Sequence, residues 1–184
     1  TMYFARLLPQ NVIIMAAIFG GLTMFYAIPI YKKQNLRSLS GAKIFIIALV
    51  WMGIAVLVPL EYHNLNLFTW RIFFHCLEIL LFVIALTLPF EIRDLKYDEP
   101  ELATIPQKLG VQKAKLLGSA LLIIAGVIAF QRSYIGDIQP IISVIIFALT
   151  MILIWISKKD QGKYFAAFWV ESVPTLWLLL LLLF

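Results

Sequence analysis

Hydrophobic residues in this chain form long uninterrupted runs, and polar residues are confined to the segments between them. In a sliding hydropathy window, six runs reach the roughly 18 residues that a helix needs to cross the hydrocarbon layer. No segment shows the polar–apolar alternation that the strands of a membrane barrel require. The pattern predicts one all-α domain over residues 1–184, a polytopic transmembrane helix bundle. The predicted spans lie at about 11–31, 43–60, 71–90, 113–130, 138–157 and 164–184.

The composition is typical of a membrane protein and excludes some kinds of site and partner. Of the 184 residues, 62% are hydrophobic and 14% are charged, which is more apolar surface than a soluble domain of this length can bury. The single cysteine, Cys76, excludes a disulfide within the chain and a multi-cysteine metal site. Despite the net charge of +5, Lys and Arg are not interleaved with aromatic residues as on a nucleic-acid-binding face, so no nucleic-acid partner is expected. Pro174 lies inside the last run and predicts a kink there.

Basic residues gather in alternate connections. With six spans, the connections at about 32–43, 91–117 and 158–163 lie on the same side, and they hold all but three of the 15 basic residues. The positive-inside rule makes that side cytoplasmic, and we expect a bacterial inner-membrane protein. Both ends of the chain would then lie outside without a signal peptide, which predicts an odd number of further spans upstream. The chain is therefore expected to be the C-terminal part of a longer protein.

One of these connections begins with a cluster of acidic residues. Asp94 and Asp98 are four residues apart, and Glu91 precedes Asp94 by three, so on a helical extension the three carboxylates share one face. Mg²⁺ prefers a small number of carboxylates and takes its other ligands from water and substrate phosphates. The alternative is an ordinary solvated loop, because 91–117 holds five acidic and five basic residues. Composition alone favours the solvated loop.

The first predicted span ends in an aromatic and basic segment on the same side. Tyr26 is followed by Lys32, Lys33, Arg37 and Lys43. A bound diphosphate needs Lys or Arg donors of this kind. The alternative is that these cations only fix the topology, with the tyrosine at the membrane interface.

These segments contain two short patterns. They are Tyr26-x-x-Pro29 followed by Lys33, and Arg93-Asp94-x-x-x-Asp98 followed by Thr104-Ile105-Pro106 and Leu109-Gly110. Taken together, the two patterns resemble the UbiA superfamily of intramembrane prenyltransferases. The resemblance implies a nine-helix fold, of which this chain would supply the last six helices. The three missing spans agree with the odd number that the topology requires. The family's first aspartate-rich motif is not in this chain, and the segment between Asp98 and Thr104 lacks the family's usual glycine.

The resemblance implies transfer of an isoprenoid chain from a prenyl diphosphate to an acceptor that is often aromatic, with Mg²⁺ as the cofactor. Asp94 and Asp98, with Glu91, would hold the metal. Without the first motif, this portion alone is expected to be inactive. The residues implied to bind or orient the diphosphate are Tyr26, Lys32, Lys33, Arg37 and Arg93.

Three ionisable residues lie inside predicted spans. His75 and Glu78 are three residues apart in the third, and Glu171 is in the sixth. A charge near the centre of a spanning helix costs about 2.5–3.5 kcal/mol, so each is expected to face protein or a water-filled cavity. A proton relay or an acceptor contact is one interpretation, and a mutually satisfied His–Glu pair is the simpler one.

Two other functions remain open. A transporter would need ionisable residues at mid-membrane depth on several helices and repeat-related broken helices. Here only Glu78 and Glu171 qualify, and the sequence shows no internal repeat. A catalytically inactive member of the family is the other alternative, and the upstream segment would distinguish it from an enzyme.

Overall fold

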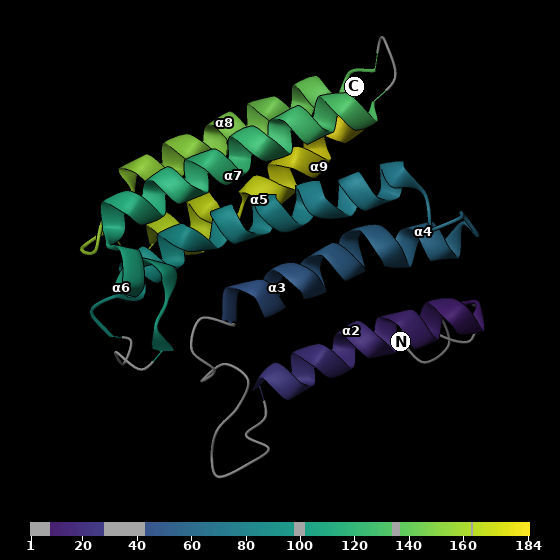
Figure 1. Cartoon of the computed structure of the whole chain (residues 1–184), viewed down its shortest axis with the longest axis horizontal. Helices are drawn as coiled ribbons and strands as arrows, with labels where there is room; N and C mark the ends of the chain where they lie inside the picture. Colours follow the sequence, from purple (N-terminus) through teal and green to yellow (C-terminus); the bar gives the residue numbers. More distant parts are fainter. Residues whose placement is uncertain (1–7, 28–42, 98–101, 134–136, 163) are drawn as a thin grey trace.

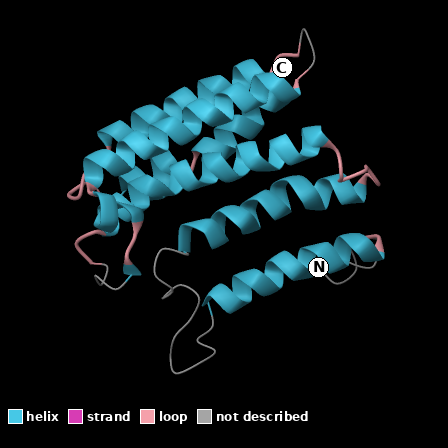
Figure 2. Cartoon of the chain, viewed as in Figure 1, coloured by secondary structure: helices cyan, strands magenta, loops and turns pink. Residues whose placement is uncertain are grey.

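The computed structural model describes residues 8–27, 43–97, 102–133, 137–162 and 164–184, and every regular element in them is helical (Figure 2). The predicted all-α class is therefore confirmed. A π-helical turn joins α3 to α4 in one continuous rod, and a second π-helical segment precedes α9. The elements are α2 (Gln10–Ala27), α3 (Lys43–Met52), η2 (Gly53–Leu57), α4 (Val58–Tyr62), α5 (Trp70–Asp94), α6 (Ile105–Leu109), α7 (Val111–Arg132), α8 (Gln139–Ile156), η4 (Phe165–Val170) and α9 (Val173–Leu183).

Five helical segments are long and apolar enough to cross a membrane, and they coincide with five of the six predicted spans. The remaining prediction, 11–31, corresponds to α2 as far as residue 27, and residues 28–31 lie outside the described part. Six spans and a nine-helix fold therefore stay predictions. Large apolar side chains cover the outward faces, as expected for helices solvated by lipid rather than water. The five segments are Lys43–Tyr62, Trp70–Asp94, Val111–Arg132, Gln139–Ile156 and Phe165–Leu183.

Helix α5 lies at the centre of the bundle (Figure 1). It begins after Thr69, whose hydroxyl accepts a hydrogen bond from the Ile72 amide at 3.3 Å. Residues 82–86 are buried one after another, because α3 packs on one flank of α5 and α7 on the other. Helix α8 packs on α7, and α2 packs against α3 at the edge. This arrangement leaves α5 with contacts on several sides and α2 with only one packed flank.

Small residues set the closest helix approaches. A methyl group added at Gly118 of α7 would lie 2.6 Å from Leu88 of α5 and 3.1 Å from Ile154 of α8. A methyl added at Gly53 of η2 would overlap the ring of Phe19 in α2. The absence of a side chain at these two positions therefore permits the helices to pack, as is usual inside membranes.

The described parts of the predicted basic connections lie at one end of the bundle, which we call the basic end (Figure 1). It comprises the start of α3, the end of α5, α6, the start of α7 and the segment between α8 and η4. Here the buried Lys115 amine donates to the Trp155 and Ser157 carbonyl oxygens at 2.8 and 2.7 Å, which satisfies the last carbonyls of α8. The Gln161 amide donates to the Pro89 carbonyl at 3.1 Å. That this end faces the cytoplasm stays a prediction.

Two helix ends differ in how well they were predicted. The kink expected at Pro174 is confirmed, since the last span is divided into η4 and α9. In contrast, α5 does not continue as a helix toward Asp98. It ends at Asp94, and the Tyr97 amide closes a turn on the Asp94 carbonyl at 2.8 Å. A single helix therefore carries Glu91 and Asp94, while Asp98 lies outside the described residues.

Candidate functional site

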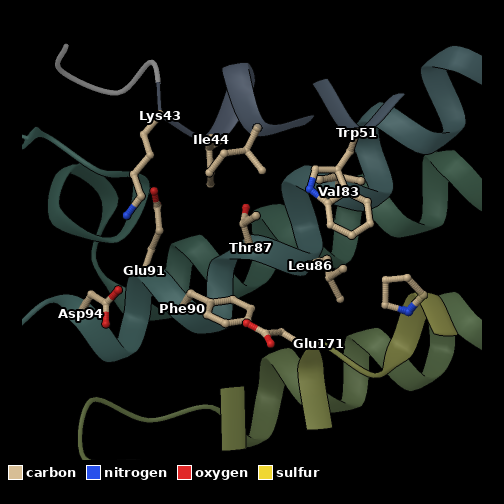
Figure 3. Close-up of a pocket in the computed structure, with 12 residues that line it drawn as sticks. Lys43, Ile44, Trp51, Val83, Leu86, Thr87, Phe90, Glu91, Asp94 and Glu171 are labelled. Atoms are coloured by element: carbon tan, nitrogen blue, oxygen red, sulfur yellow. The ribbon is translucent and has the colours of Figure 1, made fainter. Parts of the chain in front are cut away.

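A cavity of about 440 Å³ opens at the basic end between α3, α5 and the junction of η4 with α9. Its polar side chains are contributed by all three segments and surround the cavity (Figure 3). Its remaining walls are apolar and include two aromatic rings, Trp51 and Phe90. The polar lining residues are Lys43, Thr87, Glu91, Asp94 and Glu171, and the apolar ones are Ile44, Ile47, Trp51, Val83, Leu86, Phe90 and Pro174.

Helix α5 places three polar side chains along one face of the cavity. Thr87, Glu91 and Asp94 follow one another at helical spacings of four and three residues, so they project in the same direction. The prediction that Glu91 and Asp94 share a face is confirmed. Lys43, the first residue of α3, extends toward Glu91 from the neighbouring helix (Figure 3). The packing of α3 on α5 thus brings one of the predicted cations to the predicted acidic residues.

Glu91 is buried, with 3% of its surface exposed, and it holds the following segment in place. Its Oε2 accepts a hydrogen bond from the Ile105 amide, the first of α6, at 3.3 Å. Gln107 closes the same turn, since its side-chain oxygen accepts from the Thr104 amide at 2.9 Å. The Thr-Ile-Pro segment that follows the acidic cluster is therefore anchored to α5 through Glu91.

Asp94 is oriented by its neighbour. Arg93 donates from Nε to Asp94 Oδ1 at 2.7 Å and from Nη2 to Oδ2 at 3.2 Å. This two-point contact fixes the carboxylate plane, and the guanidinium also lies 5.5 Å from the centre of the Phe90 ring. Arg93 therefore acts on Asp94 directly, and the orienting role expected for it agrees with this geometry.

Glu171 completes the polar lining from the opposite wall. It lies at the junction of η4 and α9, three residues before Pro174, and its side chain points toward the α5 face (Figure 3). The sequence alone suggests a proton relay or an acceptor contact as one interpretation of this residue, but it does not predict that Glu171 faces Glu91 and Asp94. The available signal was an acidic residue beside a helix-breaking proline in an apolar run, but its proximity to α5 depends on tertiary packing.

The side chains of the other predicted site residues lie outside the described part of the structure. Asp98, Lys32, Lys33 and Arg37 lie outside the described residues, and Tyr26 belongs to α2 without a described side chain. Within the described ranges, no three His, Cys, Asp or Glu side chains gather as a metal site would need. The donors at the cavity are nevertheless of the oxygen type that suits Mg²⁺.

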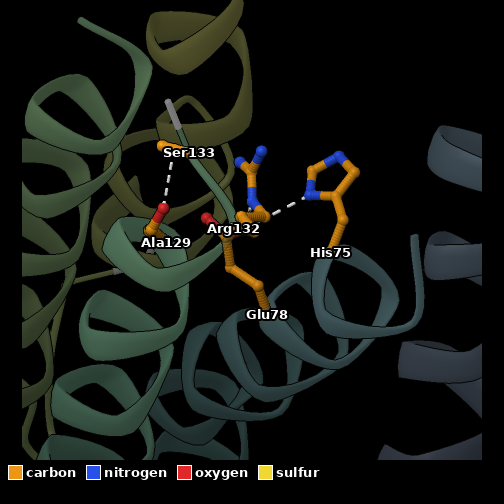
Figure 4. A network of polar contacts seen from close by, with 5 residues as sticks. All are labelled: His75, Glu78, Ala129, Arg132 and Ser133. Atoms are coloured by element: carbon orange, nitrogen blue, oxygen red, sulfur yellow. Dashed lines mark hydrogen bonds and ion pairs between the residues drawn. The ribbon is translucent and has the colours of Figure 1, made fainter. Parts of the chain in front are cut away.

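A second polar cluster lies near the other end of the bundle (Figure 4). Glu78 is fully buried. Its Oε2 accepts a hydrogen bond from Arg132 Nε at 2.5 Å and also lies 3.3 Å from His75 Nδ1. The expected His–Glu pair is therefore present, with an arginine that the sequence did not indicate. Glu78 lies 16 residues from Asp94 on α5, about 24 Å along the helix at 1.5 Å per residue. This cluster is separate from the cavity and connects α5 to α7.

Comparisons of the chain with protein-family models, with curated proteins and with solved structures find no match in any of the three. The structure supports an integral membrane helix bundle with an amphipathic cavity near its basic end.

Proposed function

We propose that the chain is the substrate-binding part of a membrane prenyltransferase of the UbiA type. The observation that carries the proposal is the cavity, which combines the charged side chains of Lys43, Glu91 and Asp94 with apolar and aromatic walls. A prenyl diphosphate has the matching division, with a charged head and a hydrocarbon tail. The volume of about 440 Å³ is also within the usual range of ligand pockets.

The charged residues would have distinct tasks in this reaction. Asp94 and Glu91, with Asp98, would hold Mg²⁺, which supplies charge neutralisation of the diphosphate when bound. Arg93 fixes the plane of Asp94 through two hydrogen bonds. Lys43 provides a cation beside the acidic face, and the predicted contacts of Lys32, Lys33, Arg37 and Tyr26 would add to it.

The apolar walls would serve the hydrocarbon part of the substrate. As the allylic C–O bond breaks, positive charge develops on carbon, and a water-free site prevents its capture by water. Trp51 and Phe90 line the cavity, and aromatic rings can attract such a charge. The chain's own residues would thus bind, orient and shield the donor.

A transporter has less support from this geometry. Glu78, one of two acidic residues on which a transport route would rest, is buried against Arg132 and His75 near the far end. Three charged groups of the cavity, Lys43, Glu91 and Asp94, instead belong to the parts of α3 and α5 at the basic end, which suits the head of an amphiphile. The remaining alternative, an inactive member of the family, differs from an enzyme only in turnover.

The test uses the full protein in its membrane. Binding of a non-hydrolysable geranyl thiolodiphosphate is measured with and without Mg²⁺, for the parent, Asp94→Asn and Asp160→Asn. Asp160 is a matched control, because it is an exposed aspartate at the same end, outside the cavity. We expect Mg²⁺-dependent binding that weakens at least tenfold in Asp94→Asn alone. Equal binding by Asp94→Asn and the parent would overturn the site assignment. Binding without transfer to any acceptor would identify an inactive family member.

A further inference from the structure

Glu171 occupies an interruption of the last spanning helix. Its amide donates to the Ala166 carbonyl in a π-type hydrogen bond of 3.2 Å, and the Ser172 amide bonds to Phe168 at 2.9 Å. The next helix, α9, starts at Val173, and Pro174 in its first turn has no amide hydrogen to continue the pattern. The span Phe165–Leu183 is therefore broken six residues, or about 9 Å, from its beginning.

A broken helix and a carboxylate within a span are both unfavourable where they meet lipid. Irregular backbone at membrane depth is tolerated where it is buried in protein or lines a cavity, and the same holds for an acidic side chain. Glu171 and Pro174 line the cavity together. The break thus lies beside the cavity, and the Glu171 carboxylate forms part of the cavity wall (Figure 3).

The three carboxylates of the cavity differ in how they are engaged. Both oxygens of Asp94 accept hydrogen bonds from Arg93, and Glu91 accepts one from the Ile105 amide. Glu171 is exposed, and within the described residues no hydrogen bond or ion pair holds its side chain. Its carboxylate and the Arg93 guanidinium attract each other electrostatically. Glu171 is thus a carboxylate available to a ligand, on the wall opposite the predicted diphosphate site.

We propose that Glu171 binds the acceptor substrate and removes its proton during transfer, an inference that rests on the proposed function. The acceptor has a nucleophilic atom X bearing hydrogen, as in a phenol. The allylic C–O bond breaks, and its electron pair leaves with the diphosphate. The pair of the X–H bond forms the new X–C bond, and the proton moves to Glu171 and then to water. The apolar residues beside Glu171 select a flat or apolar acceptor body.

The position of Glu171 opposite Asp94 and Glu91 explains how the donor and the acceptor could occupy one cavity. Asp94 and Glu91 lie on α5, while Glu171 faces them from the η4–α9 junction. A donor head held at α5 therefore leaves the opposite wall to a second molecule. This opposition brings the acceptor toward the allylic carbon, and orientation of two reactants is itself a large part of catalysis.

The test compares Glu171→Gln with Glu171→Asp, and uses Glu61→Gln in α4 as the control outside the cavity. Transfer from geranyl diphosphate to a set of phenolic acceptors is measured in the full protein, together with binding of the thiolodiphosphate analogue. In Glu171→Gln we expect kcat/KM for the acceptor to fall about 100-fold, the usual range for loss of a general base. Glu171→Asp should restore part of the rate, and donor binding should stay within twofold of the parent.

The possible failures are distinguishable. If the full protein binds no prenyl diphosphate, the proposed function is wrong, and the role of Glu171 is wrong with it. If it binds the donor but transfers nothing to any acceptor, it is an inactive family member, and the role of Glu171 in transfer is overturned. If it is active and Glu171→Gln keeps the kcat/KM of the parent, only the role of Glu171 is overturned. Loss of donor binding in Glu171→Gln, equal to that in Asp94→Asn, would also overturn it and would assign Glu171 to the diphosphate site.

Discussion

Arg132, the last residue of α7, donates a 2.5 Å hydrogen bond from Nε to Oε2 of Glu78, a fully buried residue of α5. The two residues are 54 positions apart, so the contact ties two spanning helices near the end opposite the cavity (Figure 4). His75 approaches the same oxygen at 3.3 Å. A carboxylate at this depth is tolerated because a cation and a ring nitrogen compensate for its lost hydration.

Removing the arginine alone should therefore be costly. We expect Arg132→Met to lower the free energy of unfolding by about 3–5 kcal/mol, because it leaves a buried carboxylate without its cation. The double variant Arg132→Met with Glu78→Leu should recover most of this loss, since no buried charge remains. Unfolding of the purified protein in mixed detergent micelles measures both. Equal stability of the parent and Arg132→Met would show that Glu78 does not depend on this pair.

The second prediction compares two lysines of α7 at the basic end. Lys115 is buried and donates to two carbonyl oxygens at the end of α8, whereas Lys113 is exposed one half-turn earlier. Lys115→Met should cost roughly 1–3 kcal/mol, because it leaves both carbonyls without their donor. Lys113→Met should change the unfolding free energy by less than about 0.5 kcal/mol. Similar effects of the two substitutions in the same unfolding assay would contradict the assigned role of Lys115.

The fold could be predicted from the sequence more completely than the site. The spans follow from run length, and the shared face of Glu91 and Asp94 follows from helical spacing, because both are local properties. The end of α5 at Asp94 was not foreseen, since i, i+4 spacing alone does not say where a helix stops. The local break at Pro174 was foreseen from the proline alone.

The missed features all depend on distant partners. The contact of Arg132 with Glu78 arises only when α7 packs on α5. Lys115 lies within the predicted span 113–130, but its contact with the end of α8 arises only from the packing of α7 on α8. Glu171 joins the cavity because the η4–α9 junction faces α5. A single sequence contains no record of these pairings, so charge counts overstate how many cations remain available to a ligand.

Helix packing gives a third prediction through two glycines. Gly118 lies against Leu88 and Ile154, whereas a methyl group added at Gly20 would meet no described atom within 4 Å. Gly118→Val should lower the unfolding free energy by about 1–3 kcal/mol, because α7 would have to move away from α5 and α8. Gly20→Val, a matched change on α2, should have an effect below about 0.5 kcal/mol. Equal losses for both variants would show that helix propensity, and not packing, determines the cost.

The last prediction concerns the exposed ion pair between Lys96, after α5, and Asp160, between α8 and η4. Lys96 Nζ lies 3.2 Å from Asp160 Oδ1, and this hydrogen bond raises the pKa of Lys96 above its ordinary value of 10.5. A raised lysine pKa means that the folded state holds the proton more tightly than the unfolded state. The contribution of this ion pair to stability is therefore complete below the ordinary lysine pKa and is lost as the pH rises through the pKa of the folded state.

We expect the Lys96 pKa, measured by NMR of labelled lysine side chains, to return toward 10.5 in Asp160→Asn. Both sites are well exposed, so 1 M salt should reduce the shift. A Lys96 pKa unaffected by Asp160→Asn would show that the pair does not persist in solution.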